Sequence, residues 1–359
     1  MLDLLLDPLT GTERSRWAVP GDGGSDDEMT GCKPVPPKSE KQEEKHKEKE
    51  RDKQHARPWA ARAGAYARGM RILLTNDDGI HAPGIEALYR ALVDLDGRFG
   101  GPVCGAEVVW PVAPLEVQSA TSHGVTFRTP LMVTQETVSP EMTGLAVDGR
   151  PADCVKLAIC SLWPERFGAG SRPDLVISGM NAGANVGINV IYSGTVAAAI
   201  EAAFLGVPSI AVSLHLGRGT TRFDLGAAHA RRAIERVVRG GMTGDAEAPL
   251  GPHDCLSINI PCCQQEPLDP PTPEEPELVF CPMNTHGLND SYERRVSPGG
   301  DLYYWASGHG LDFRSADPGT DVDLLLRRKI TVTPLRYDLT AHHRLAPWRR
   351  ALDGAPARP

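Results

Sequence analysis

A short apolar run that ends in two adjacent carboxylates constrains this chain most. Residues 70–80 have the sequence Met-Arg-Ile-Leu-Leu-Thr-Asn-Asp-Asp-Gly-Ile, and such a run is typical of a strand buried on both faces. Side chains alternate along a strand, so Asp77 and Asp78 can face one site only where the strand becomes a loop. Gly79 permits that turn. Two interpretations stay open: a hard-cation site, or an Asp-Gly turn that caps the next helix.

From residue 70 onward, apolar segments alternate with amphipathic ones, which predicts a parallel sheet covered by helices on both faces. Further strands are expected at 106–110, 174–178, 208–214, 256–260 and 329–335, with short extended pieces near 125–135, 144–147 and 302–305. Helices are expected at 83–93, 152–163, 196–205 and 224–239.

Both ends of the chain differ from this pattern. Residues 38–53 carry alternating charges and no apolar face, so we expect residues 1–69 to form a disordered, charged extension outside the core. The alternatives are that these residues form an interaction tail, or that the start is placed too early and Met70 is the true first residue. Residues 346–359 are polar and contain Pro and Arg, which predicts a flexible tail.

Composition narrows the class of protein. The net charge of −8 argues against binding to a nucleic-acid polymer, which usually requires a basic face. No stretch approaches the about 20 apolar residues that a membrane helix needs, and the first residues lack the basic region of a signal peptide. The eight cysteines are scattered without a Cys-x-x-Cys pair, which is typical of reduced thiols and predicts a cytoplasmic location.

The loops that follow the strands should carry the chemistry, because open parallel sheets bind ligands beyond the carboxyl ends of their strands. Three such loops matter: residues 76–82, 113–124 and 179–195. They bring together side chains with oxygen atoms: Asp77, Asp78, Ser119, Asn181 and Asn185. Oxygen donors without Cys or His favour Mg²⁺, Mn²⁺ or Ca²⁺ over zinc.

A possible anion site lies at the start of the helix expected from residue 196. Ser193, Gly194 and Thr195 precede it, where free N–H groups and the helix dipole favour a negative charge. The alternative is that Ser193 or Thr195 only caps the helix. Asn181 and Asn185 could likewise serve as turn residues.

An oxygen-ligand site beside an anion site suits phosphoryl chemistry. The chain has no Gly-x-x-x-x-Gly-Lys-Ser/Thr loop, no Gly-x-Gly-x-x-Gly motif and no Gly-x-Ser-x-Gly elbow. A P-loop ATPase, a dinucleotide oxidoreductase and a serine hydrolase of the elbow type are therefore disfavoured.

Residues 72–85 resemble the opening motif of the SurE family of metal-dependent 5'-nucleotidases. Further stretches that are similar to this family lie at 113–119, 151–155, 178–185, 190–199, 319–321, 330–335 and 338–342. The resemblance implies a three-layer αβα sandwich around a mostly parallel, Rossmann-like sheet. It implies a phosphatase domain at 70–345, in which 277–345 includes a β-rich oligomerisation segment that forms a homodimer or homotetramer.

The resemblance also implies the site. Asp77 and Asp78 would be the catalytic residues, and together with Ser119 and Asn181 they would bind one divalent cation per subunit, Mg²⁺ or Mn²⁺. Substrate phosphate would contact Asn185, Ser193, Gly194 and Thr195. The implied reaction is hydrolysis of nucleoside 5'-monophosphates to nucleoside and phosphate, extending in some members to 3'-nucleotides and polyphosphate.

Departures from the family pattern leave questions open. Ala120 stands where Gly is usual, and Arg150 stands where a small residue is usual, so Arg150 could enter the pocket or face solvent. The general acid is not identified, although His81 and His123 lie on the relevant loops. Two other functions remain as alternatives: a Mn-dependent nucleotide-sugar glycosyltransferase-like enzyme, and a non-catalytic nucleotide-binding protein.

Overall fold

The structure is a computed structural model that describes residues 69–240, 250–289, 291–307 and 311–353. All of these residues belong to one compact unit, 58–359. The charged extension predicted at 1–69 lies outside the described residues except for Gly69, so that prediction stays a prediction.

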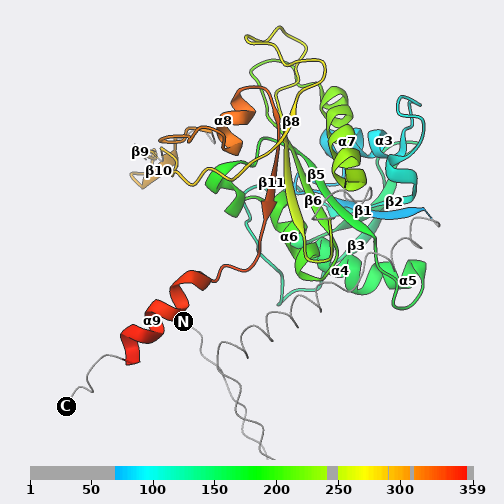
Figure 1. Cartoon of the computed structure of the whole chain (residues 1–359), viewed down its shortest axis with the longest axis horizontal. Coiled ribbons are helices and arrows are strands. Elements are labelled where there is room, and N and C mark those ends of the chain that lie inside the picture. The colour runs from blue at the N-terminus through cyan, green and yellow to red at the C-terminus, as the bar shows by residue number, and fades with distance from the viewer. Residues whose placement is uncertain (1–68, 241–249, 290, 308–310, 354–359) are drawn as a thin grey trace, which may run out of the picture. The chain divides into compact units, whose positions relative to one another are not determined.

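A nine-stranded sheet forms the centre, in the order β3-β4-β2-β1-β5-β6-β7-β11-β8 (Figure 1). Its strands are β1 (Met70–Thr75), β2 (Ala106–Pro114), β3 (Val133–Thr137), β4 (Thr143–Val147), β5 (Leu175–Ala182), β6 (Ser209–Leu214), β7 (Cys255–Ile260), β8 (Leu278–Phe280) and β11 (Ile330–Leu335). In the order of the sheet, strands β4, β2, β1, β5, β6 and β7 all run parallel to one another. Strand β3 is antiparallel to its neighbour β4, and β11 is antiparallel to its neighbour β7. The sheet is therefore mostly parallel, as predicted.

Helices cover both faces of the sheet, which confirms the αβα sandwich (Figure 1). Helices α3 (Pro83–Val93) and α7 (Phe223–Gly240) pack on one face, and α4 (Pro151–Leu157) and α6 (Gly194–Phe204) pack on the other. The burial of strand β1 explains why its residues 72–74 are all apolar. Ile72 and Leu74 join the core under α3 and α7, whereas Leu73 joins the opposite core under α4 and α6.

The helix expected at 152–163 is divided into three pieces. After α4, residues Ala158–Leu162 form a π-helical segment (η3), and α5 covers Trp163–Phe167. Pro164 has no N–H to donate within the helix, so the backbone widens by one residue before it. The buried Trp163 ring then packs against Trp110 and Phe167.

Strand lengths also differ from the predictions. Strand β2 extends to Pro114 and β5 extends to Ala182, so both end closer to the candidate site than expected. The extended piece expected at 125–135 forms a strand only from Val133, because residues 125–132 pair with no described strand.

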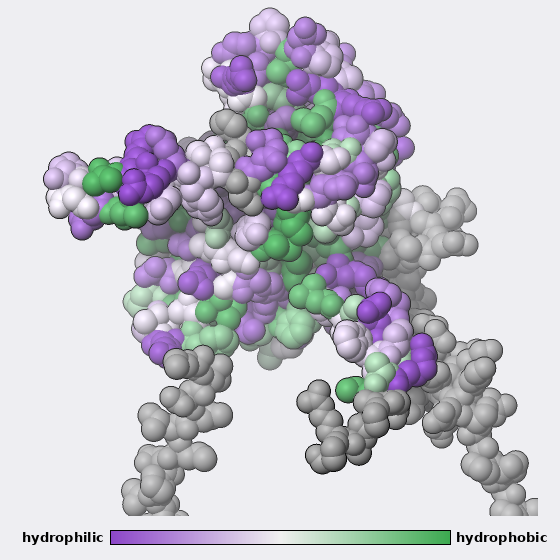
Figure 2. Space-filling model, turned by 90° about the vertical axis from the view of Figure 1, so that its left-hand side faces the viewer, coloured by the Kyte–Doolittle hydropathy of each residue, from purple (hydrophilic) through white to green (hydrophobic). Residues whose placement is uncertain are grey.

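The C-terminal third adds irregular structure. Strands β9 (Tyr292–Val296) and β10 (Leu302–Ala306) form an antiparallel hairpin in which every residue is exposed. On the face shown in Figure 2, hydrophobic residues gather in small groups between hydrophilic ones.

The remaining elements are η2 (Val103–Gly105), η4 (Gly187–Ile191), α8 (Asp321–Leu326) and α9 (His342–Asp353). Helix α9 covers the first part of the tail that was expected to be flexible. None of the described helices is long and apolar enough to cross a membrane.

Candidate metal centre

The three loops named from the sequence leave the same edge of the sheet. Strand β1 lies between β2 and β5, and all three run in the same direction. The chain continues from β1 to β2 on one side and returns to β5 on the other, which is the kind of switch point where such sheets bind ligands. The loop after β1 is hydrogen-bonded to both neighbours. The Ile80 N–H donates to the Pro114 carbonyl at 2.8 Å, and the Ala182 N–H donates to an Asp78 carboxylate oxygen at 2.8 Å.

Asp77 is buried and held from the start of helix α6. The hydroxyl of Thr195 donates a hydrogen bond to its Oδ1. Gly194 lies so close that a Cβ on it would be 2.8 Å from the Cβ of Asp77, so only glycine allows this approach. On the other side, the Gln118 N–H donates to the Asp77 carbonyl at 2.7 Å. The loops that follow β1 and β2 and the start of α6 thus meet at Asp77.

Asp78 follows β1, and Asn181 lies near the end of the neighbouring strand β5. The N–H that binds Asp78 belongs to Ala182, the residue that follows Asn181. The Asn181 side-chain amide donates to the Gly183 carbonyl at 2.8 Å, which leaves its amide oxygen as the group available to a cation. The two residues therefore fit the pairing predicted for a metal site.

Electrostatics at this edge favour a bound cation. Burial raises the pKa of Asp77 to about 6, the charge of Asp78 adds to that rise, and the Thr195 hydrogen bond opposes it. Burial also raises the pKa of Asp78, against the effect of the Ala182 N–H. Beside them, the Oδ1 atom of Asn76 is buried without a hydrogen-bond partner. A divalent cation would compensate the buried negative charge.

Ser119 lies on the loop 113–124, directly after Gln118, and its side chain is exposed. The loop is fixed against η4, since Ser122 donates from its N–H to the Tyr192 carbonyl at 3.1 Å and from its hydroxyl to the Ile191 carbonyl at 2.7 Å. Ala120 has a φ of 56°, in the left-handed region where a glycine would be unstrained. Ala120, which stands where glycine is usual in the family, therefore occupies a strained position next to the predicted ligand Ser119.

The donor set decides which metals fit. Among the described residues, no group of three or more His, Cys, Asp or Glu side chains is arranged to hold a metal ion. A cation here would therefore depend on hydroxyl and amide oxygens in addition to the two carboxylates. Such a set of hard oxygen donors suits Mg²⁺ or Mn²⁺ and does not suit a structural zinc site.

The comparison with known proteins identifies the family. The model of the family described as Survival protein SurE matches residues 72–276. The chain belongs to the SurE family. It is 40% identical over 278 residues to "5'-nucleotidase SurE" of Desulforudis audaxviator (strain MP104C), an alignment that covers 77% of this chain and 95% of that protein. It is 38% identical over 297 residues to "5'-nucleotidase SurE" of Carboxydothermus hydrogenoformans, covering 80% and 99% of the two chains.

A solved structure supports the same assignment. The crystal structure of the SurE protein from Aquifex aeolicus superimposes with a TM-score of 0.58 at 30% sequence identity. The superposition covers 79% of this chain and 99% of that one. The SurE fold therefore accounts for the sheet and for the placement of the three loops at its edge.

In this SurE chain, the residues predicted to contact phosphate also have internal partners. The Ser193 hydroxyl accepts a hydrogen bond from the Val196 N–H at 3.1 Å and so caps α6. The Asn185 side chain donates to Ser213 at 2.9 Å, and the Asn185 N–H donates to Asn259 at 2.8 Å. Contact of these residues and of Gly194 with phosphate stays a prediction.

Sequence reasoning missed one group, the buried carboxylate Glu201 on α6. It accepts hydrogen bonds from His123 at 2.8 Å and from Lys156 at 3.0 Å. This contact ties the Ser119 loop and helix α4 to helix α6. A charged residue inside an otherwise apolar helix was the available signal. His81 pairs instead with Glu136 at 3.4 Å.

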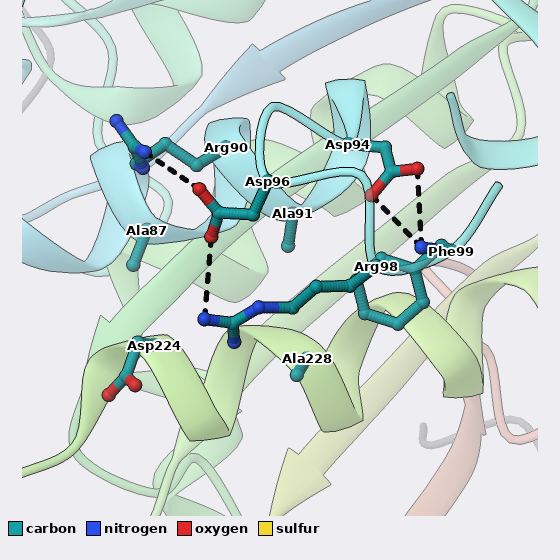
Figure 3. Close-up of a pocket in the computed structure, with 9 residues that line it drawn as sticks. All are labelled: Ala87, Arg90, Ala91, Asp94, Asp96, Arg98, Phe99, Asp224 and Ala228. Atoms are coloured by element: carbon teal, nitrogen blue, oxygen red, sulfur yellow. Dashed lines mark hydrogen bonds and ion pairs between the residues drawn. The ribbon is translucent and has the colours of Figure 1, made fainter. Parts of the chain in front are cut away.

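A separate pocket between α3 and α7 contains none of the predicted site residues (Figure 3). Its charged side chains already have partners within the protein. Arg90 lies 2.9 Å and Arg98 lies 3.7 Å from the Asp96 carboxylate. Asp94 accepts the Phe99 N–H at 3.0 Å. The two guanidinium groups share the Asp96 carboxylate, and Arg90 also lies 3.5 Å from the Glu141 carboxylate. The pocket contains none of the predicted metal ligands, so the metal centre remains the candidate site.

Proposed function

We propose that this chain is a metal-dependent nucleotidase that hydrolyses nucleoside 5'-monophosphates to nucleoside and phosphate. The observation that carries the proposal is the pair Asp77 and Asp78, held at the end of β1 by Thr195 and Ala182. Membership of a family whose relatives are named 5'-nucleotidases supports the choice of substrate. The chain is thus a phosphoric monoester hydrolase.

We further propose that Asp77, Asp78, Ser119 and Asn181 hold one divalent cation per subunit, Mg²⁺ or Mn²⁺. Such a cation supplies polarisation of a phosphoryl oxygen and a lowered pKa of bound water. Thr195 orients Asp77 through its hydroxyl, and Ala182 fixes Asp78 through its N–H. These two contacts set the direction of the carboxylates before any ligand arrives, which is how supporting groups tune a metal site.

The hairpin of β9 and β10 supports the proposal that the protein forms a homodimer or homotetramer. Tyr303 and Trp305 are exposed on one face of the hairpin, with ring centroids 6.5 Å apart. An isolated two-stranded hairpin is marginally stable in water, and exposed aromatic side chains are typical of interfaces. A second copy of the chain would bury them.

A substrate panel tests the proposed function. The purified chain is incubated with 5'-AMP, 3'-AMP, p-nitrophenyl phosphate, polyphosphate or UDP-glucose, after EDTA treatment and after return of Mg²⁺ or Mn²⁺. We expect phosphate release from 5'-AMP only with metal. Release of the sugar from UDP-glucose without phosphate release from any monoester would favour the glycosyltransferase-like alternative and overturn the proposal. Binding of 5'-AMP without turnover under every metal condition would favour a non-catalytic protein.

A further inference from the structure

Arg150 is a cation beside the metal centre that none of the assignments above uses. Its backbone begins helix α4, where its N–H donates to the Asp153 carboxylate at 3.0 Å. The same carboxylate accepts hydrogen bonds from the N–H and hydroxyl of Thr126, both at 2.8 Å. The start of α4 is therefore fixed to the segment that follows the Ser119 loop.

The side chain of Arg150 lies on that loop. A Cβ on Gly124 would be 2.2 Å from an Arg150 guanidinium nitrogen and 2.9 Å from its Cζ, so the guanidinium covers the Gly124 backbone. The next residue, Pro151, approaches Gly194, where a Cβ would be 3.1 Å from the proline ring. The same Cβ would be 2.8 Å from Asp77. Residues 150 and 151 thus extend from the Ser119 loop to the buried carboxylate.

Among the described residues, no ion pair neutralises the charge of Arg150. Its side chain is exposed, and in the described part of the chain no carboxylate or carbonyl accepts a hydrogen bond from its guanidinium. The neighbouring cations differ, because His123 and Lys156 both bind Glu201. Arg150 therefore keeps its donors available to a ligand at this edge.

A cation at this position would stabilise the dianion of a phosphate monoester. A divalent metal held by Asp77 and Asp78 is formally neutralised by the two carboxylates, so it leaves little net positive charge for a dianion. A planar guanidinium forms strong, charge-assisted hydrogen bonds to phosphate oxygens.

We propose that Arg150 is a substrate-binding residue that donates hydrogen bonds to the phosphate group of the nucleotide. This inference rests on the proposed function. The guanidinium lies over Gly124, on the loop that carries Ser119. It would neutralise charge on the phosphate oxygens and hold the phosphate against that loop.

Steady-state kinetics with 5'-AMP test the inference, with Arg150→Ala, Arg150→Lys and a matched control, Arg128→Ala. Arg128 is also exposed and follows the same loop. We expect Arg150→Ala to raise the KM and the inhibition constant of inorganic phosphate by roughly tenfold to hundredfold, as for loss of a charge-assisted hydrogen bond. Arg150→Lys should recover part of this loss, and Arg128→Ala should match the wild type.

A second variant moves the guanidinium without removing it. Gly124→Ala places a methyl group where the Arg150 side chain lies, and the long side chain can move away without disturbing the backbone. We expect Gly124→Ala to raise the KM in the same direction. In all variants, the affinity for Mn²⁺ measured by calorimetry should stay within about twofold of wild type, because Arg150 is no ligand.

The outcomes separate this inference from the proposed function. An inactive wild-type enzyme overturns the proposed function itself. An active wild type with KM and phosphate inhibition unchanged in Arg150→Ala overturns the role of Arg150 alone. An equal rise of KM in Arg128→Ala would show a general effect of charge and would also contradict the inference.

Discussion

At the scale of single residues, the site depends on contacts between positions far apart in the sequence. Asp77 and Asp78 were predictable because an apolar strand has to end where two carboxylates adjoin a glycine. The hydrogen bond from Thr195 to Asp77 was not predictable, because it joins residues 118 positions apart. The predicted contact of Thr195 with phosphate stays a prediction, and its hydroxyl is directed to the Asp77 carboxylate. Local pattern identifies candidate side chains, and tertiary packing decides which atoms they contact.

Replacing Thr195 by Val tests this contact, because the substitution removes the hydroxyl and keeps the shape of the side chain. Asp77 would lose the donor that orients it, so we expect metal affinity and activity to fall roughly tenfold to hundredfold, as for other groups that orient metal ligands. Thr195→Ser keeps the hydroxyl and should recover most of the loss. Mn²⁺ titration followed by calorimetry measures the effect. Equal affinities in Thr195→Val and wild type would contradict the role given to Thr195.

At the scale of elements, hydrophobic periodicity and composition predicted most strands and helices, but their ends are determined by strand pairing and by local backbone geometry. Strands β2 and β5 continue past their apolar cores to Pro114 and Ala182, because pairing with neighbouring strands satisfies their backbone groups. The helix expected at 152–163 changes its winding before Pro164. Glu201 on α6 is hydrogen-bonded to the Ser119 loop and to α4. These contacts join three segments that are distant in the chain, so the sequence of no single segment predicts them.

The Glu201 tie makes a prediction about stability and pH. Burial raises the pKa of Glu201, but hydrogen bonds from His123 and Lys156 outweigh it, so the net pKa lies below the usual 4.5. A lowered pKa in the folded state stabilises the protein above pH 4.5, and this contribution is lost as the pH falls through the folded value. We expect Glu201→Gln to lower the free energy of unfolding at pH 7 by about 1–2 kcal/mol.

Urea unfolding at several pH values checks this prediction. The difference between wild type and Glu201→Gln should shrink as the pH falls below 4.5, while Glu165→Gln, at an exposed position, should leave stability unchanged. A difference that is constant between pH 7 and the acid range would show that the charge of Glu201 does not contribute.

At the scale of the whole molecule, the sheet order explains why one edge carries the chemistry. Strands β2, β1 and β5 are adjacent, so loops separated by about a hundred residues in the chain emerge side by side. The hairpin of β9 and β10 has no comparable internal role, because all of its residues are exposed within one chain. The sequence indicated an extended segment near 302–305, but it did not indicate what this segment packs against.

Self-association through this hairpin is testable by light scattering after size-exclusion chromatography. The double variant Tyr303→Glu, Trp305→Glu introduces charge on one face, and we expect its mass to fall to that of a single chain. Arg294→Ala lies on β9 opposite Tyr304, on the other face of the hairpin, and should keep the wild-type mass. A wild-type protein that is already a single chain, or a double variant of unchanged mass, would exclude the hairpin as the interface.

The claim that Asp77 and Asp78 anchor a metal-dependent phosphatase centre is tested most directly by one measurement. Phosphate release from 5'-AMP is followed in the wild type, in Asp78→Ala and in Glu107→Ala, whose exposed carboxylate lies near the start of β2 at the opposite edge of the sheet. Each protein is assayed after EDTA treatment and after return of Mn²⁺ or Mg²⁺. We predict metal-dependent release in the wild type and in Glu107→Ala, and a loss of roughly a hundredfold or more in Asp78→Ala. Full activity in Asp78→Ala, or release from the wild type that is the same with and without metal, would contradict the account.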